Sequence, residues 1–387
     1  MFTLWRAKKH GILENVRHSA FGRKVLVSGV ARPFLKPLNL KHNNQTEAVE
    51  MADVFHELGY QVDVINHDRP MAIDYANYDV LFGWGVPFEN LYLRETTRFP
   101  RTILYMPGAP AAIANAAGLR RLEAVYRRRG VWLPQSARLW PMGIGFEAQV
   151  DGIIALGNAV NAEPWRALTG RPVHELPLFY LPVLDPEEML RSRDLARTRR
   201  HFLWFAGTGL VHKGLDLVLE AFGRHPELDL HVYGRIDLEP GFVRAFHREL
   251  RELPNIHVGG YLGLGDPGFR AALLESAFVI CPSCSEASCS SILNICGNGG
   301  QVPLLTRACG IDLGDFGVVI RDTSVEAVEA ALAEATALSD AELERRTRGS
   351  AAFFAREHRR ELYHQRLKEA IQAILASAVH PGGQPQG

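Results

Sequence analysis

The stretch FVICPSCSEASCSSILNICGNGGQVPLL, residues 278–305, carries the pattern that decides the fold. It opens with a short apolar run typical of a buried strand, passes through a loop at Pro282 and becomes helical near Ser288. The apolar side chains of that helix recur at i, i+3, i+4 and i+7: Cys289, Ile292, Leu293 and Cys296. A second apolar run follows two glycines. Strand, helix and strand in this order predict one unit of a parallel sheet covered by helices.

The same alternation runs along most of the chain. In the first half, strands are predicted at 24–30, 61–66, 79–85, 101–106, 152–157 and 173–179. In the second half they are predicted at 201–207, 228–234, 255–260, 277–283, 301–305 and 317–320. Thr46 is expected to cap the first helix. The sequence therefore predicts an α/β protein with two Rossmann-like domains in tandem, whose open sheets face each other across a cleft.

A change in composition divides the two domains. The segment LPVLDPEEMLRSRDLARTRR, residues 181–200, combines two prolines with a dense run of charges, which is typical of a linker. The predicted organisation is a first domain over 1–184, a linker over 185–200, a second domain over 201–357, and a C-terminal helix with a disordered tail over 358–387.

Composition excludes some classes of partner. The 43 basic and 43 acidic residues balance, so no global field favours nucleic acid. Five cysteines without framework spacing and an N-terminus without a long apolar segment favour a cytoplasmic protein with reduced thiols. The opening MFTLWRAKKH mixes apolar and basic residues, and two interpretations stay open: peripheral contact with the inner face of a membrane, or a frayed terminus.

Two further chemistries are tested and set aside. The first predicted strand runs into SGVARPFLKP, and GGYLGLGDPG at 259–268 has the wrong spacing, so neither supplies the GxGxxG motif of a dinucleotide site. Cys281 and Cys284 form a CxxC pair, but no second pair stands at zinc-ribbon spacing and no thioredoxin-like context surrounds it. We expect packing thiols and no metal site.

Two loops after predicted strands of the second domain are candidates for phosphate binding. Lys213 and Gly214 stand at the start of a helix, where a lysine adds its charge to the amide groups and the positive end of the helix dipole. A solvated lysine is the alternative. Polar side chains also recur along one face of the helix described first, at Ser290, Asn294 and Asn298. This polar face predicts a ligand-facing surface.

These residues resemble a known family. The order of strand, KG and helix in FAGTGLVHKGLDLVLEAF, followed by strand, PS-x-x-E and helix in FVICPSCSEASCSSILNICG, resembles the donor domain of the retaining GT-B glycosyltransferases of family 4. The resemblance covers about residues 200–335, while the first domain is similar only in architecture. It implies a GT-B fold and transfer of a sugar from a nucleotide sugar.

The resemblance also implies roles for single residues. Lys213 would hold the donor phosphates and Glu286 would contact the transferred sugar. The remaining donor-side positions are Thr208, Gly209, the amides of Ser288, Cys289 and Ser290, and Asn294, which would bind the ribose. Thr208 and Asn294 depart from the family, which usually has a phosphate-binding arginine and a second glutamate there. Both keep hydrogen-bonding capacity but lose charge.

The chemistry expected from these residues is metal-independent transfer. A nucleoside diphosphate gains negative charge as it leaves, and Lys213, Thr208 and helix N-termini supply fixed donors for it without a cofactor. Retention of configuration, implied by the resemblance, would let the leaving phosphate accept the proton of the acceptor. UDP and GDP donors are both compatible with the sequence, and the acceptor is expected to be a glycan, a lipid-linked compound or a natural product, as in polysaccharide biosynthesis.

The acceptor side is expected in the first domain, where the sequence says less. His42, Asn43 and Asn44 stand in a polar loop after the first strand, and either acceptor contact or an ordinary loop before a helix explains them. Five arginines follow the fourth strand and would meet a lipid diphosphate or an acidic glycan, or form a solvated helix face: Arg120, Arg121, Arg127, Arg128 and Arg129.

Two functions of different class remain at this point. The leading one is a glycosyltransferase. The other is a catalytically weak GT-B protein that binds a nucleotide or glycan and acts through a partner, which the departures at Thr208 and Asn294 favour. Lys213 and Glu286 are the predicted catalytic residues of the first.

Overall fold

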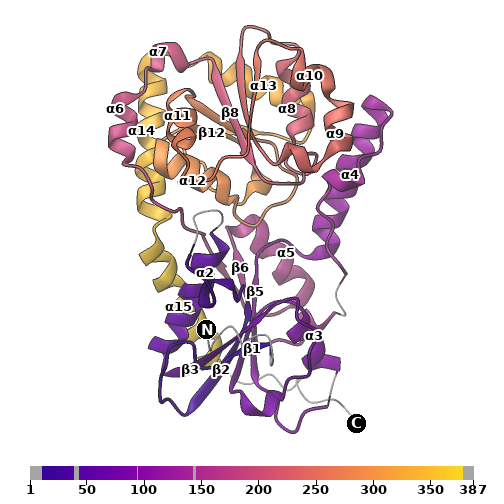
Figure 1. Cartoon of the computed structure of the whole chain (residues 1–387), viewed down its shortest axis with the longest axis vertical. Coiled ribbons are helices and arrows are strands. Elements are labelled where there is room, and N and C mark those ends of the chain that lie inside the picture. Colours follow the sequence, from indigo (N-terminus) through magenta and orange to yellow (C-terminus); the bar gives the residue numbers. More distant parts are fainter. Residues whose placement is uncertain (1–10, 39–42, 94, 143–144, 378–387) are drawn as a thin grey trace. The chain divides into compact units, whose positions relative to one another are not determined.

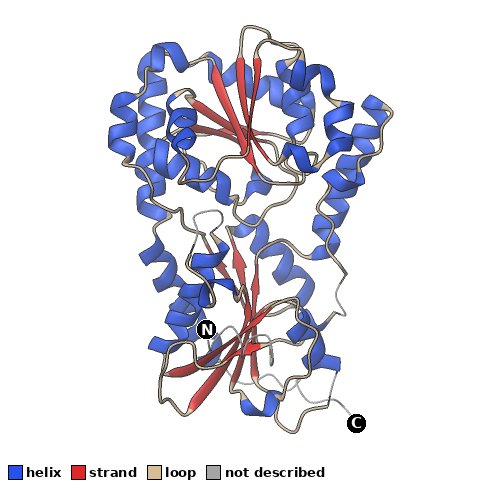
Figure 2. Cartoon of the chain, in the orientation of Figure 1, coloured by secondary structure: helices blue, strands red, loops and turns tan. Residues whose placement is uncertain are grey.

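The computed structural model describes residues 11–38, 43–93, 95–142 and 145–377 (Figure 1). The chain forms two compact units. The first unit consists of the residues up to Pro107, Met142–Leu176 and the residues from Glu361 onward. The second unit consists of Gly108–Pro141 and Pro177–Arg360. Figure 2 shows a sheet flanked by helices in each unit.

The first unit contains a seven-stranded sheet. Its strand order is β1 (Ile12–Leu13), β3 (Tyr60–Asn66), β2 (Arg23–Gly29), β4 (Val80–Gly83), β5 (Arg101–Met106), β6 (Gly152–Leu156) and β7 (Val173–Leu176). All neighbours are parallel except β1, which runs antiparallel to β3. The six predicted strands are confirmed. β1 was missed, because two residues are too short to show a period.

Helices of the first unit come from both ends of the sequence. They are α2 (Asn44–Glu57), α3 (Val86–Leu93), α5 (Ala159–Thr169) and α15 (Arg360–Ala376). Asn43, and not Thr46, is the N-cap of α2. A Cβ on Gly152 would lie 2.7 Å from Ile374, so the glycine allows α15 to pack directly on β6. The C-terminal helix, predicted as a trailing element, is therefore part of the first unit.

The second unit contains a parallel six-stranded sheet. Its strand order is β10 (Ile256–Gly260), β9 (Asp229–Gly234), β8 (His201–Ala206), β11 (Phe278–Cys281), β12 (Val302–Thr306) and β13 (Val318–Ile320). All six predicted strands are confirmed. The order reverses between β8 and β11, and ligands of open α/β sheets bind beyond the carboxyl ends of strands at such a switch point.

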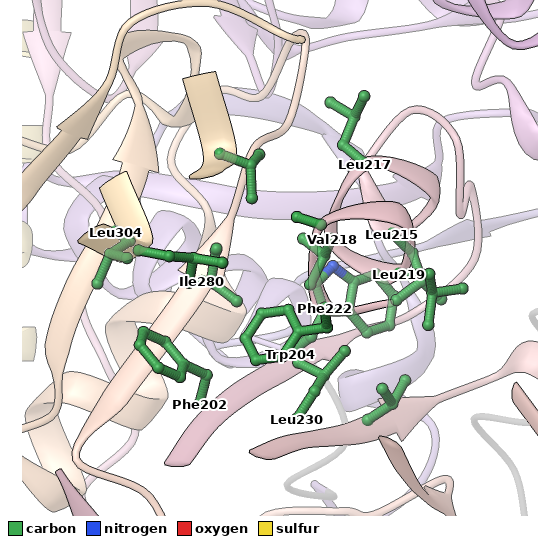
Figure 3. Packing of buried hydrophobic residues seen from close by; sticks show 14 of the residues in the cluster. Phe202, Trp204, Leu215, Leu217, Val218, Leu219, Phe222, Leu230, Ile280 and Leu304 are labelled. Atoms are coloured by element: carbon green, nitrogen blue, oxygen red, sulfur yellow. The ribbon is translucent and has the colours of Figure 1, made fainter. Parts of the chain in front are cut away.

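Two groups of helices cover this sheet. One group is α8 (Leu215–Phe222), α10 (His247–Arg251) and α13 (Val325–Thr336), and the other is α11 (Pro267–Leu274), α12 (Ser290–Gly299) and α14 (Asp340–Glu357). Where α8 packs on the sheet, the core is filled by large side chains, among them Phe202 and Trp204 of β8 and Phe222 of α8 (Figure 3). Burial of such residues is the main stabilising contribution to the unit.

The segment 108–141, predicted in the first domain, belongs to the second unit. Its helix α4 (Ala111–Arg129) adds Leu122 and Val125 to the core of that unit. Arg121 donates two hydrogen bonds to Asp216, at 2.7 and 2.6 Å, and both side chains are buried. Arg128 also pairs with Asp216 at 2.7 Å, and Arg129 pairs with Glu249 at 2.7 Å.

These ion pairs correct the interpretation of the arginine cluster. For Arg121, Arg128 and Arg129, neither a lipid diphosphate nor open solvent is the partner, because carboxylates of the second unit take that place. Arg127 pairs with Glu123 on the exposed side of α4. The sequence did not reveal this, because the acidic partners lie about a hundred positions further along the chain.

The predicted linker, 185–200, is mostly helical. It forms α6 (Pro186–Ser192) and α7 (Leu195–Thr198), capped by the side chains of Asp185 and Asp194. Both helices pack against α14. Aspartate followed by proline at 185–186 is an N-cap followed by the first helical position, a signal that we interpreted as a break.

No helix among the described residues is long and apolar enough to cross a membrane. The segment MFTLWRAKKH, on which membrane contact was predicted, lies outside the described residues, as do the tail HPGGQPQG and His42.

Candidate functional site

The loop after β8 brings Lys213 to the carboxyl end of the sheet. Lys213 is followed by Gly214, which has φ +72° and precedes α8. A Cβ on Gly214 would lie 2.5 Å from the carbonyl oxygen of Pro282. Glycine is therefore required twice here, for the left-handed backbone and for close approach to the loop after β11.

Hydrogen bonds join the loop after β8 to the loop after β11. The amide of Cys284 donates to the carbonyl oxygen of His212 at 3.0 Å, and the hydroxyl of Ser283 contacts the same oxygen at 3.2 Å. The amide of Glu286 donates to the carbonyl oxygen of Ala308 at 2.9 Å. Since the two loops flank the switch point, these bonds set Lys213 and Glu286 side by side.

Lys213 and Glu286 form a nearly buried ion pair. Lys213 Nζ lies 2.5 Å from Glu286 Oε1, and the two side chains are 10% and 9% exposed. Ser283 Oγ donates to the same carboxylate oxygen at 3.0 Å. Burial opposes both charges, but Lys213 and its neighbours hold the pKa of Glu286 below its usual value, while Glu286 raises the pKa of Lys213. Both groups are charged at neutral pH.

Arg138 is a third charged residue at this site, and sequence reasoning missed it. Its Nη1 lies 3.6 Å from Glu286 Oε2, and its side chain is 38% exposed. A Cβ on Gly209 would lie 2.8 Å from Arg138 Cγ, so the arginine stem lies over the Gly209 backbone. Thr208, beside it, is exposed. The cation thus comes from the segment that follows α4, which carries no motif.

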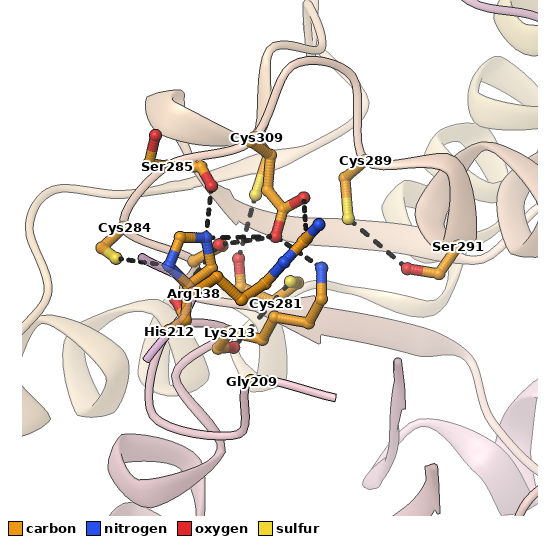
Figure 4. A network of polar contacts seen from close by, with 12 residues as sticks. Arg138, Gly209, His212, Lys213, Cys281, Cys284, Ser285, Cys289, Ser291 and Cys309 are labelled. Atoms are coloured by element: carbon orange, nitrogen blue, oxygen red, sulfur yellow. Dashed lines mark hydrogen bonds and ion pairs between the residues drawn. The ribbon is translucent and has the colours of Figure 1, made fainter. Parts of the chain in front are cut away.

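His212 and Cys284 form a neutral pair beside the charged residues (Figure 4). His212 Nε2 lies 2.5 Å from the carbonyl oxygen of Ser285, and the Cys284 thiol lies 3.5 Å from Nδ1. Burial lowers the pKa of His212 and raises the pKa of Cys284 to about 12. The thiol therefore stays protonated, unlike the reactive thiolate of a redox CxxC pair.

The remaining cysteines of the opening stretch pack in the core. Cys281, Cys289 and Cys296 are buried, as predicted for Cys289 and Cys296. Among the described residues no group of three or more His, Cys, Asp or Glu side chains is placed to hold a metal ion.

The backbone amides of two predicted donor-side residues are engaged within the protein. The amide of Gly209 donates to Glu239 Oε1 at 2.5 Å, and the amide of Cys289 donates to the carbonyl oxygen of Cys309 at 3.0 Å. In this structure the Cys289 amide is bonded to Cys309, and its contact with a ligand stays a prediction. Glu239, a buried carboxylate that anchors the loop after β8, was not foreseen.

Other donors around the start of α12 stay candidates. Ser288 is nearly buried, and its hydroxyl has no hydrogen-bond partner among the described residues. Ser290 begins α12, so its amide belongs to the first helical turn, whose amides lack partners within the helix. A buried hydroxyl without a partner is costly, and a ligand at this edge of the sheet would satisfy it.

Two of the three residues on the polar face of α12, Asn294 and Asn298, form hydrogen bonds with the backbone of another segment. Asn294 Oδ1 accepts from the amide of Leu181 at 2.8 Å. Asn298 Oδ1 accepts from the amides of Val183 and Leu184 at 2.7 and 2.9 Å, and its Nδ2 donates to Leu181. The periodicity was correct, but the predicted ligand-facing surface holds the backbone of 181–184 instead. A ribose contact of Asn294 stays a prediction.

The predicted acceptor residues lie in the first unit. Asn43 is buried at the N-cap of α2 and Asn44 begins that helix. These positions fit the alternative interpretation, a polar loop before a helix, and their contact with an acceptor stays a prediction.

Comparisons with known proteins give a clear result only for structure. No family model matches the sequence, and no curated protein matches it. A glycosyltransferase from Rickettsia africae superimposes with a TM-score of 0.59 at 11% identity, covering 92% of this chain and 100% of that one. Anabaena HepE, solved with UDP and glucose, gives 0.57 at 10% identity, covering 91% and 99%.

The chain has the GT-B fold. A UDP-forming trehalose-phosphate synthase from Burkholderia xenovorans agrees, with a TM-score of 0.56 at 11% identity, covering 92% of this chain and 100% of that one. At such low identity the likeness shows the fold alone. Within the GT-B fold, Lys213 and Glu286 lie at the switch point of the C-terminal Rossmann-like unit.

Proposed function

We propose that this protein is a glycosyltransferase that moves a sugar from a nucleotide sugar to an acceptor. One observation carries the proposal: a buried Lys213–Glu286 pair with Arg138 at the switch point of a GT-B sheet. Solved proteins of similar fold were crystallised with UDP and sugar, which supports a nucleotide-sugar donor.

The donor diphosphate would lie between the cations. Lys213 and Arg138 supply positive charge where the leaving group gains negative charge, and Lys213 is held in place before the reaction by Glu286. The hydroxyls of Thr208 and Ser288 add neutral donors. Glu286 would orient the transferred sugar and stabilise positive charge that develops on its ring.

Stereochemistry and acceptor are proposed on the resemblance. The reaction would be retaining and metal-independent, with the leaving phosphate accepting the proton of the acceptor hydroxyl on the same face of the sugar. The acceptor would be a glycan, a lipid-linked compound or a natural product.

Titration with nucleoside diphosphate sugars, with donor hydrolysis followed in parallel, tests the proposal. We expect one UDP- or GDP-linked donor to bind and to be hydrolysed slowly without an acceptor. Glu286→Gln keeps the shape of the site and should lower kcat together with kcat/KM, because it weakens a contact needed in the transition state. Glu227→Gln serves as the control, because Glu227 is exposed and is not one of the site residues.

A second function is favoured by specific contacts. The amides of Gly209 and Cys289 are already bonded within the protein, which leaves fewer donors for a leaving group, and Asn294 Oδ1 already accepts a hydrogen bond from Leu181. These contacts favour a catalytically weak GT-B protein that binds a nucleotide or glycan and acts through a partner. Tight donor binding without turnover under any acceptor would support this second function. Absence of binding to every nucleoside diphosphate sugar would overturn the glycosyltransferase, and absence of binding to glycans as well would overturn both.

A further inference from the structure

A cavity lies in the first unit at the carboxyl ends of β2 and β3. Its volume is about 250 Å³. The floor is apolar and includes Leu13, Ala31 and Leu35. Asn66, the last residue of β3, joins the loops around it, since its Oδ1 accepts from the amide of Ala31 at 3.2 Å. The carboxyl edge of a parallel sheet is where open α/β folds bind ligands.

Among the described residues that line this cavity, three are cations and none is acidic. They are Arg32, Lys36 and Arg69. None of the three forms an ion pair with any described residue, whereas most other arginines of the first unit do. Arg32 is oriented by a hydrogen bond of 2.5 Å to Gln45 Oε1. Asp68, the nearest acid in sequence, instead accepts from Asn66 Nδ2 at 2.6 Å.

Three like charges around one apolar hollow repel each other unless an anion lies between them. The repulsion is tolerable in water because the side chains are exposed. An anion in the hollow would meet all three cations above a floor of low polarity, where attraction is stronger than in open solvent. Guanidinium groups also match the geometry of phosphate and carboxylate oxygens.

We infer that this cavity binds the anionic group, a phosphate or carboxylate, of the acceptor. That the ligand is the acceptor rests on the proposed function, whereas anion binding by the cavity does not. The volume is below the range of about 300–1,000 Å³ typical of drug-sized ligands, so a phosphate with a few attached carbons fits better than a whole disaccharide.

The test is a titration of the full chain with inorganic phosphate, followed by amide NMR at low salt. We expect shifts at Gly11, Ala31 and Asn66, which line the cavity. Lys36→Gln with Arg69→Gln should weaken the affinity on the order of tenfold or more, because two charged contacts are lost. These two side chains form no other hydrogen bond or ion pair with described residues, so the fold is expected to be kept. Arg98→Gln, which removes an exposed arginine paired with Asp79, is the matched control and should change nothing.

Three further arms separate the explanations. Acetate against phosphate distinguishes a carboxylate from a phosphate ligand, and a hexose phosphate against the free hexose tests whether the anion carries the affinity. Phosphate affinity that is equal in wild type and double variant, or shifts confined to the second unit, would overturn the inference. UDP titrated separately should shift Gly209 and Gly214. Loss of that response with phosphate binding intact would count against the proposed function alone.

Discussion

At the scale of single residues, the site depends on one carboxylate that several groups share. Lys213, Ser283 and Arg138 all approach Glu286, from three separate stretches of the chain. Lys213 is held tightly in this pair. The more exposed Arg138 has its Nη1 3.6 Å from Glu286 Oε2, and other N–H groups of its guanidinium can donate to a ligand. Arg138 is thus the cation most readily redirected to an entering diphosphate.

Replacement of Arg138 tests this assignment. Arg138→Gln should raise the Kd for UDP on the order of tenfold, the scale of one lost charge-assisted contact, and should affect UMP less. Arg138→Lys should recover part of the affinity. Calorimetric titration checks the values, with Arg127→Gln as an exposed control outside the site. Equal UDP binding in wild type and Arg138→Gln would contradict the role.

Local sequence sufficed for Lys213 and Glu286 but not for Arg138. The first two stand in short motifs directly after strands, so their position follows from chain order and strand direction. Arg138 reaches the same place only because α4, which precedes it, packs into the core of the second unit. Its position depends on tertiary contacts such as Arg121 with Asp216, which no local pattern encodes.

At the scale of elements, the attachment of α4 rests on a buried ion pair. Arg121→Ala should destabilise the second unit by up to about 3–5 kcal/mol, because it leaves the buried Asp216 with only the partly exposed Arg128 as a partner. Arg127→Ala removes an exposed pair on the same helix and should cost at most about 0.5 kcal/mol. Urea unfolding compares the two variants. If both variants lose a similar free energy of unfolding, the buried Arg121–Asp216 pair does not stabilise the unit more than an exposed pair does.

Helical periodicity correctly predicted which residues share one face of a helix, but it did not predict which part of the chain that face contacts. The polar face of α12 was located correctly, yet Asn294 and Asn298 bind the 181–184 backbone. The period of a helix or strand depends on residues close in sequence. Which segment packs against a given face depends instead on how the whole chain is connected. The same reason explains why the helices in 185–200 were interpreted as a linker.

At the scale of the whole molecule, one buried network joins distant parts of the sequence in the first unit. Tyr105 donates to Glu47 Oε2 at 2.6 Å and lies 2.9 Å from the hydroxyl of Tyr363 on α15. Burial raises the pKa of Glu47 to about 7, against a hydrogen bond from Tyr105 that lowers it. The folded state therefore keeps a proton on Glu47 that the unfolded state releases from pH 4.5 upward.

Stability of the first unit should accordingly fall as pH rises from 4.5 to 7. Glu47→Gln, which is neutral at every pH, should be more stable than wild type above pH 7, by on the order of 3 kcal/mol, and should show no gain near pH 4.5. Denaturant unfolding at both pH values measures this. Glu57→Gln is the control of opposite sign, since a hydrogen bond from Lys368 lowers the pKa of Glu57. A pH-independent effect of Glu47→Gln would refute the assignment.

The division of each unit into separate stretches of chain has a consequence for synthesis on the ribosome. The first unit is completed only by α15, after nearly the whole second unit has been synthesised. At about 5–20 residues per second, the apolar surface of β6 that receives Ile374 waits roughly ten seconds or longer for its helix. The nascent chain therefore exposes an unfinished sheet during this interval, when a chaperone that shields apolar surface would bind it.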